Sequence, residues 1–225
     1  MKKLITITIL IFLTITSCRY DRTCENIDLI LIDSFAISTI NLDSIDNKKN
    51  LEAYILDKTN YEEMCNYNYI FNVITSYEKN LIKVPITFFK FCPYDRPIAT
   101  PDDTLKLQIN NKKLKDIDAF KESISFKIDS LFSKYIININ TKIPHIIIVW
   151  QDDLKLSSFH IIIDCIVESY FTQLNNYTVE FYKKEINCVN KDNLSILKNK
   201  FPLKIRFAIK DISEWPPPPP PPPSD

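Results

Sequence analysis

The stretch His145–Ile166, HIIIVWQDDLKLSSFHIIIDCI, decides the fold because it holds a strand, a turn and the start of a helix in one run. Its first six residues form an uninterrupted apolar segment of strand length, which predicts a strand near the centre of a sheet. A polar turn follows at Gln151–Asp153, and Ser157 is expected to cap the helix after it. The predicted helix has one apolar face, and a polar stripe recurs on it every four residues. The apolar face is Phe159, Ile162, Ile163, Ile166, Val167 and Tyr170, and the polar stripe is His160, Asp164, Glu168 and Thr172.

Upstream of this stretch, the pattern predicts another strand and another helix. Apolar and polar residues alternate over Leu105–Ile109, as in a half-buried strand. Asn110-Asn111 is expected to form a turn. Asp116 can cap the helix that follows, because its carboxylate accepts from free N–H groups of the first turn. Pro144 ends the helical pattern, whose apolar positions are Ile117, Phe120, Ile124, Ile128 and Leu131.

Downstream of the deciding stretch, the pattern returns to strands. Asn175-Asn176 is expected to end the helix that begins near Ser157. Tyr177–Tyr182 alternates aromatic or branched residues with polar ones, which predicts a strand. Asn187–Asn199 is typical of a loop or a short helix. Lys204–Lys210, KIRFAIK, alternates again and predicts the last strand.

The N-terminal part of the chain contains several runs of residues that favour strands. Ile27–Asp33, IDLILID, predicts one strand. Tyr69–Thr75 and Ile82–Phe91 lie on either side of a polar connection and predict a hairpin. Pro85 has no N–H group to donate to a neighbouring strand, so we expect the second strand of this hairpin at an edge of the sheet.

Together these patterns predict an α+β fold. We expect a small mixed sheet with two helices packed on one face, preceded by a β-rich N-terminal region. Cys92–Asp103 contains three prolines and is typical of a loop or linker between these parts. The expected organisation is a β-rich region over 27–100, an α+β domain over 103–212 and a proline-rich tail over 213–225.

The chain contains no glycine. Glycine is the usual residue where φ is positive, so we expect asparagine to take this role at Asn110-Asn111 and Asn175-Asn176. Phosphate-binding loops, dinucleotide fingerprints and nucleophile elbows all need glycine for close backbone approach. Their absence from the sequence excludes the enzyme classes that depend on them.

The first eighteen residues, MKKLITITILIFLTITSC, match a bacterial lipoprotein signal peptide. A basic start precedes a short apolar run, Leu4–Thr16, and the end Ile15-Thr16-Ser17-Cys18 fits the lipobox. We therefore expect removal of residues 1–17, acylation of Cys18, and a tether over 18–26 that holds the domain at a membrane of the cell envelope. An ordinary secretory signal is the alternative. The run is too short for a spanning helix, which needs about 20 apolar residues.

Cysteine and charge usage limit the possible partners. An exported chain can form disulfides, but five cysteines remain beyond Cys18, so at least one stays free or pairs with another chain. No C-x-x-C motif occurs and only two histidines are present, so we expect neither a metal site nor another cofactor. Acidic and basic residues balance, which argues against a nucleic-acid partner. The pairing of the five cysteines stays open: Cys24, Cys65, Cys92, Cys165 and Cys188.

The order strand, helix, strand, helix, strand over Asp103–Glu185 resembles the periplasmic domain of the ExbD/TolR biopolymer-transport family. In that family an apolar strand ends in an aspartate-containing turn before the second helix, and here Asp152 or Asp153 takes that place. The resemblance implies a folded protein-binding domain. Two departures are clear: Leu4–Thr16 has none of the acidic residues that the family uses for proton coupling, and the glycine after the second helix is replaced by Asn175-Asn176.

Four groups of side chains are candidate sites, each with a structural alternative. Asp152-Asp153 could serve a metal or acid–base chemistry, or be a solvated turn. His160 and Asp164 lie one helical turn apart and could form a dyad, but the sequence names no nucleophile for it. Ser157 and Ser158 are better explained as caps. Four tyrosines could line a ligand surface or pack within strands: Tyr61, Tyr67, Tyr69 and Tyr77.

The tail carries the most specific candidate for partner binding. Eight consecutive prolines follow Trp215 and must form a polyproline II rod of roughly 25 Å. Such rods dock on aromatic grooves of protein partners, and a simple spacer is the alternative. The expected contacts are Trp215, Pro216, Pro219 and Pro223.

The sequence as a whole favours a non-enzymatic protein-binding or scaffolding lipoprotein of a bacterial envelope, which could serve an envelope transport system. A surface lipoprotein that binds solutes or glycans is one alternative, which a deep aromatic pocket would favour. An envelope hydrolase is another, which a cleft joining His160 to a nucleophile would favour.

Overall fold

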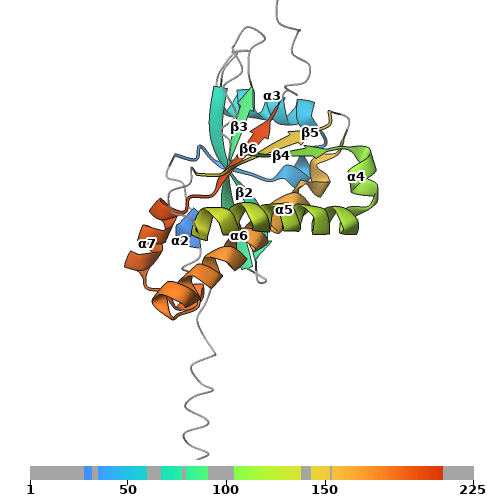
Figure 1. The fold of residues 1–225 in the computed structure, drawn as a ribbon. Helices are drawn as coiled ribbons and strands as arrows, with labels where there is room; N and C mark the ends of the chain where they lie inside the picture. The colour runs from blue at the N-terminus through green and yellow to red at the C-terminus, as the bar shows by residue number, and fades with distance from the viewer. Residues whose placement is uncertain are drawn as a thin grey trace, which may run out of the picture.

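The computed structural model of the chain describes residues 28–31, 35–59, 67–77, 80–90, 104–137, 143–152 and 154–209 (Figure 1). The lipobox segment, the tether, the proline-containing segment 91–103 and the polyproline tail lie outside these residues, so the expectations for them stay predictions. The same holds for the side chains of Cys18, Cys24, Tyr61, Cys65, Tyr67, Cys92, Asp153 and Trp215.

The described strands form one mixed sheet in the order β1-β2-β3-β6-β5-β4. β2 and β3 are an antiparallel hairpin, and every other pair of neighbours is parallel. The predicted α+β class is therefore confirmed, as are the hairpin and the last strand. The strands are β1 (Thr39–Ile40), β2 (Tyr67–Tyr77), β3 (Asn80–Lys90), β4 (Thr104–Ile109), β5 (His145–Trp150) and β6 (Lys204–Ala208).

Two long helices, α5 and α6, pack side by side against one face of this sheet, as expected. In the view of Figure 1 they run across the lower part of the molecule, and α3 lies near the upper ends of β2 and β3. Leu51 and Ile55 of α3 join the same core as α5 and α6. Short 3₁₀ turns precede α3, α6 and α7. The helices are α2 (Asp28–Leu31), α3 (Lys48–Thr59), α4 (Asn111–Lys115), α5 (Ile117–Ile137), α6 (Phe159–Tyr182) and α7 (Lys191–Lys200), and the 3₁₀ turns are Leu42–Ser44, Leu156–Ser158 and Ile186–Cys188.

The strand β5 lies inside the sheet, between β4 and β6, as its apolar run predicts. Ile146, Ile148 and Trp150 alternate along β5 and join the large core shared with α5 and α6. Ile147 and Val149 point to the opposite face and are buried as well. The Trp150 ring packs edge-on against Phe159 at 5.6 Å, which holds the first turn of α6 against the end of β5.

The strand predicted at Ile27–Asp33 is wrong, because Asp28–Leu31 forms the short helix α2. Ile30 and Leu31 are both buried in the large core. Helix α2 contacts α7 and β3, and these contacts supply the burial that the apolar run needs. A four-residue apolar run satisfies a strand or a helix equally well, so its pattern alone could not separate the two.

The strand predicted at Tyr177–Tyr182 is also wrong, because α6 continues without interruption through these residues. Tyr177 and Phe181, four residues apart, stack with ring centroids 4.3 Å apart, which is a helical spacing. Asn175-Asn176 does not end the helix. The Asn175 side chain instead accepts a hydrogen bond from the Ile186 N–H at 2.9 Å, which ties the following turn back to α6.

The helix ends at Lys183, whose φ of 55° is the only positive φ among the described residues. The expectation that asparagine replaces glycine in this role is therefore wrong. Asn110 has an extended φ of −140° and caps α4, so Asn110-Asn111 begins a short helix where a turn was expected. The left-handed conformation is unfavourable for lysine by roughly 1–2 kcal/mol.

The predicted helix starts are half correct. Asp116 accepts a hydrogen bond from the Ala119 N–H at 3.4 Å and caps α5 as predicted. Ser157 does not cap α6: it lies within a 3₁₀ turn, the cap position is Ser158, and no side chain bonds the first turn there. The 3₁₀ turn runs directly into α6, as is common at helix N-termini.

The edge position predicted from Pro85 is wrong, since β3 lies between β2 and β6. The register explains how the sheet accommodates a proline. β6 pairs with β3 only from Ile86 onward, so the missing N–H of Pro85 falls just beyond the described ladder. The same pairing joins strands from both sides of segment 91–103, so the regions expected at 27–100 and 103–212 build one sheet and one large core.

Candidate functional site

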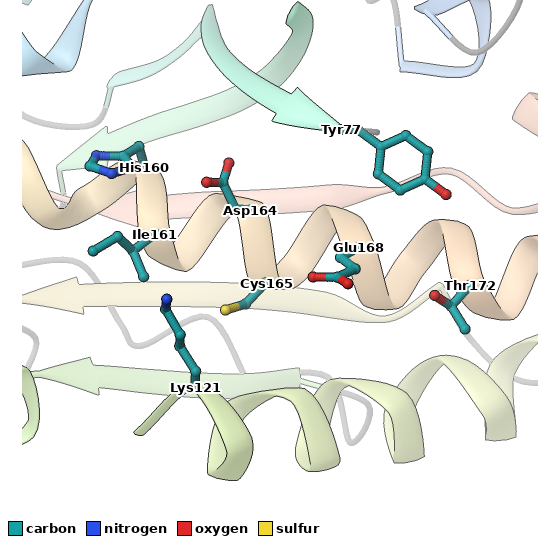
Figure 2. A pocket seen from close by; sticks show the side chains of 8 residues that line it. All are labelled: Tyr77, Lys121, His160, Ile161, Asp164, Cys165, Glu168 and Thr172. Carbon is teal, nitrogen blue, oxygen red and sulfur yellow. The ribbon is translucent and has the colours of Figure 1, made fainter. Parts of the chain in front are cut away.

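The polar stripe of α6 borders an open groove, which we call the stripe groove (Figure 2). Its volume is about 780 Å³, within the usual range of small-ligand and peptide sites. Lys121 projects toward it from α5, and Tyr77 contributes from the end of β2. The groove is lined by Tyr77, Lys121, His160, Ile161, Asp164, Cys165, Glu168 and Thr172.

Two features of the fold place these side chains. The four-residue spacing of the stripe keeps its members on one side of α6, while the apolar face of the same helix is buried in the core. The ring of Tyr77 packs against Phe171 at 4.7 Å, so the end of β2 is held beside the helix. The groove therefore depends on contact between the hairpin and α6, which are far apart in sequence.

Asp164 is fixed by a hydrogen bond from the hairpin. The buried hydroxyl of Thr75 on β2 donates to the Asp164 carboxylate. His160 lies one turn earlier on α6 and is exposed at the same groove. His160 and Asp164, the predicted pair, therefore both line the groove. Asp164 also has a structural role, because its hydrogen bond with Thr75 links α6 to β2.

Cys165 is the one thiol in the groove, and its surroundings oppose ionisation. Burial raises the pKa of Cys165, and the carboxylates of Glu168 and Asp164 raise it further. The Lys121 ammonium and a hydrogen bond with Ser125 act in the other direction but do not cancel the effect of burial. Since the thiolate is the reactive form, a raised pKa disfavours the reactive form of Cys165.

The aspartate turn after β5 has a structural partner. Lys48, the first residue of α3, forms an ion pair with Asp152, and its ammonium donates to the Trp150 carbonyl at 3.1 Å. The Lys48 side chain is only 6% exposed, whereas that of Asp152 is 68% exposed. This contact ties α3 to the end of β5. The described residues contain no group of three or more metal-ligating side chains, and the contact of Asp152 that the structure shows is the ion pair with Lys48.

The remaining candidates differ in whether they border the groove. Tyr69 and Tyr77 both pack against the hydrophobic core, as their strand interpretation implies, and Tyr77 also borders the groove. Ser157 and Ser158 lie in the turn before α6 and outside the groove. Cys165 and Cys188 are both free thiols.

Sequence patterns missed Lys48, Thr75 and Lys121 as contributors to these sites. Lys48 and Trp150 are 102 residues apart, and Thr75 and Asp164 are 89 residues apart. Lys121 occupies an ordinary polar position of an amphipathic helix. No local sequence pattern indicates such contacts, because they depend on how β2, α3 and α5 pack against β5 and α6.

Comparison with known proteins adds no relative: no family model, no curated protein and no solved structure matches the chain. Within the described ranges, no helix combines the length and the apolar character needed to cross a bilayer. Fold and site together define an α+β domain with an open, mixed-charge groove along one helix.

Proposed function

We propose that the chain is a lipid-anchored, non-enzymatic binding module of a bacterial cell envelope, and that the stripe groove receives a protein partner. The lipobox end at Cys18 supports the anchor. The polyproline tail beginning at Pro216 is proposed as a second point of contact for partners, through its stiff rod.

One observation carries the binding role: among the described residues that line the groove, polar side chains gather and none is an activated nucleophile. Its only thiol has a raised pKa, and its Asp164 carboxylate is bonded to Thr75. An enzyme of the hydrolase type needs a nucleophile poised near a base. A binding surface needs only shape and fixed charge, which the groove supplies.

The charges of the groove indicate the chemistry of the partner. Asp164 and Glu168 stand against the single cation Lys121, and Glu168 is exposed. Tyr77 adds an aromatic ring at one end. A partner segment with a basic side chain flanked by apolar or proline residues fits this arrangement, because opposite charges fix register and suppress wrong partners.

The ExbD/TolR resemblance is kept as part of the proposal. The order β4, α5, β5, α6 with both helices on one face of the sheet supports it. The helical Tyr177–Tyr182, where the resemblance implies a strand, weighs against close kinship. The acid-free segment Leu4–Thr16 means that a proton-coupled role is not part of the proposal.

The anchor is tested by Cys18→Ala. We expect the variant to leave the membrane fraction and to lose incorporation of labelled palmitate. Membrane retention with unchanged labelling would refute lipid anchoring at this residue.

The groove is tested by a matched pair of charge reversals on α6. Glu168→Lys changes the groove, and Glu180→Lys changes an exposed site outside it. On native gels of detergent-extracted membranes, we expect the wild type and the Glu180 variant to migrate as a complex, and the Glu168 variant to migrate as the isolated chain. Identical migration of all three would argue against a partner in the groove.

A cysteine hydrolase is the second candidate, because the groove joins His160 and Cys165 in one hollow. The two candidates differ in thiol reactivity. Peptide mapping after brief iodoacetamide treatment at pH 7 should label Cys165 more slowly than the half-buried Cys188. Faster labelling of Cys165, abolished by His160→Ala, would favour the hydrolase.

A further inference from the structure

A second hollow lies between the edge strand β4 and the helices α4 and α5. Its volume is about 430 Å³, and it does not share a residue with the stripe groove. We call it the lysine pocket. It is lined by Lys106, Leu107, Gln108, Asn110, Lys112, Lys113, Asp116, Ala119, Phe120, Ser123, Ile124 and Lys127.

The lysine pocket has an uncompensated positive charge. Four ammonium groups line it, and Asp116 is the one carboxylate among the lining residues. That carboxylate already accepts from the Ala119 N–H as the cap of α5. Among the described residues, none of the four lysines forms an ion pair with a carboxylate. The four lysines are Lys106, Lys112, Lys113 and Lys127.

Lys113 is held in place at this pocket. Its ammonium donates to the Gln108 carbonyl on β4 and lies 5.7 Å from the centre of the Phe120 ring. Burial lowers the pKa of Lys113, and the neighbouring Lys127 ammonium lowers it further. Two cations that repel one another in a partly buried site are stabilised when an anion binds between them.

The pocket also has an apolar side. Leu107 and Ile124 are buried beneath it, and the Phe120 ring is part of its wall. Asn110 and Ser123 add polar side chains. A site of this volume with cationic and apolar walls suits a ligand that carries both a charged group and a compact apolar or ring-shaped part.

We propose that the lysine pocket binds a phosphate ester attached to a small glycerol or sugar unit. Lysine is a common ligand for phosphate, and the ester's organic part would rest on Leu107, Phe120 and Ile124. The headgroup of an anionic phospholipid and a soluble phosphorylated sugar or glycerol both have this chemistry. This site goes beyond the proposed function and does not depend on the groove.

The test uses two probes on the full chain with Cys18→Ser, so that an acyl anchor cannot mask binding. The soluble probe is glycerol 1-phosphate, followed by calorimetry. The membrane probe is vesicles of phosphatidylglycerol, compared with neutral phosphatidylcholine vesicles in flotation. The pocket variant is Lys112→Gln/Lys127→Gln. Its matched control, Lys49→Gln/Lys191→Gln, removes the same charge from exposed positions outside the pocket.

We expect the pocket variant to bind at least about tenfold more weakly than the wild type, with the control unchanged and with binding weakened by salt. Such a loss with glycerol 1-phosphate supports a soluble ligand, and the same loss with phosphatidylglycerol vesicles alone supports a lipid headgroup. Absence of binding to both probes, or an equal loss in both variants, would overturn the proposal.

Discussion

The two halves of α6 meet different surroundings. The first half, through Thr172, presents its polar stripe to the open groove. The second half, through Tyr182, is docked against α7 and the end of α5 by aromatic rings. The stripe half lines the groove, although its Asp164 also accepts a hydrogen bond from Thr75, whereas rings of the second half pack against the end of α7. The groove and the aromatic contacts with the end of α7 therefore lie along successive parts of one helix.

The end of α7 is held by hydrogen bonds from tyrosines of α5 and α6. The hydroxyls of Tyr170 and Tyr135 donate to the carbonyls of Phe201 and Lys200, at 2.6 and 2.9 Å, where α7 ends. The Lys200 ammonium donates to the Tyr177 hydroxyl at 2.7 Å. The two tyrosine hydroxyls satisfy the carbonyls of Lys200 and Phe201 at the end of α7, which a helix cannot satisfy by itself. We refer to Tyr135, Tyr170, Tyr177, Phe181 and Phe201 as the aromatic cluster.

Removal of the central ring of the aromatic cluster should have the largest effect. Phe201 is 1% exposed and its ring packs against Tyr177 at 4.9 Å and Tyr135 at 5.6 Å. Phe201→Ala should lower the free energy of unfolding by about 3–5 kcal/mol in denaturant titration. Thr172→Ala in the stripe half should change it by less than about 0.5 kcal/mol. An equal loss of stability in Phe201→Ala and Thr172→Ala would contradict the difference proposed between the two halves of α6.

Removal of one cluster hydroxyl should have a smaller effect. Tyr170→Phe leaves the Phe201 carbonyl buried without its donor, so we expect a loss of about 1–2 kcal/mol in the free energy of unfolding. Tyr182→Phe is the matched control in the same helix and should be close to neutral. A neutral Tyr170→Phe would mean that packing alone holds α7.

Relief of the left-handed residue at the end of α6 should stabilise the protein. Lys183→Gly removes the Cβ from a position with φ of 55°, and we expect a gain of about 1 kcal/mol in the free energy of unfolding. Lys184→Gly, one residue later, has no positive φ to relieve and should be neutral or destabilising. A loss of stability in Lys183→Gly would show that its side chain makes contacts that outweigh the strain.

High pH should weaken the contribution of the aromatic cluster to stability. Burial raises the pKa of Tyr135 to about 12 from its usual value near 10. Its stabilising effect is therefore present below pH 10 and declines as the pH rises through 10 to 12. Unfolding titrations across this range should show that decline in the wild type and a shallower one in Tyr135→Phe. The same slope in both would assign the decline to other groups.

The sequence predicts the centre of the fold well because its signals are local. HIIIVW is a buried strand, and the apolar face from Phe159 to Tyr170 fixes the helix that follows. The alternation at Tyr177–Tyr182 is ambiguous, since the same aromatic residues also satisfy a helix once α7 covers Tyr177. The outcome there is decided by tertiary packing, through Phe201 and Lys200, and not by local preference.

The candidate site was predictable only in part, for the same reason. The stripe His160, Asp164, Glu168 and Thr172 follows from helical spacing. The groove beside this stripe also needs Tyr77 from β2 and Lys121 from α5. The raised pKa of the Cys165 thiol depends on burial, which the sequence does not show.

The most direct test of the binding role is site-specific photo-cross-linking in cells. A photoreactive residue at position 172 lies in the groove, and one at position 180 is exposed on the same helix outside it. We predict a discrete cross-linked protein from position 172 that disappears when Glu168→Lys is added, and none from position 180. An equal pattern from both positions, or a product that is insensitive to Glu168→Lys, would contradict the groove as the binding site.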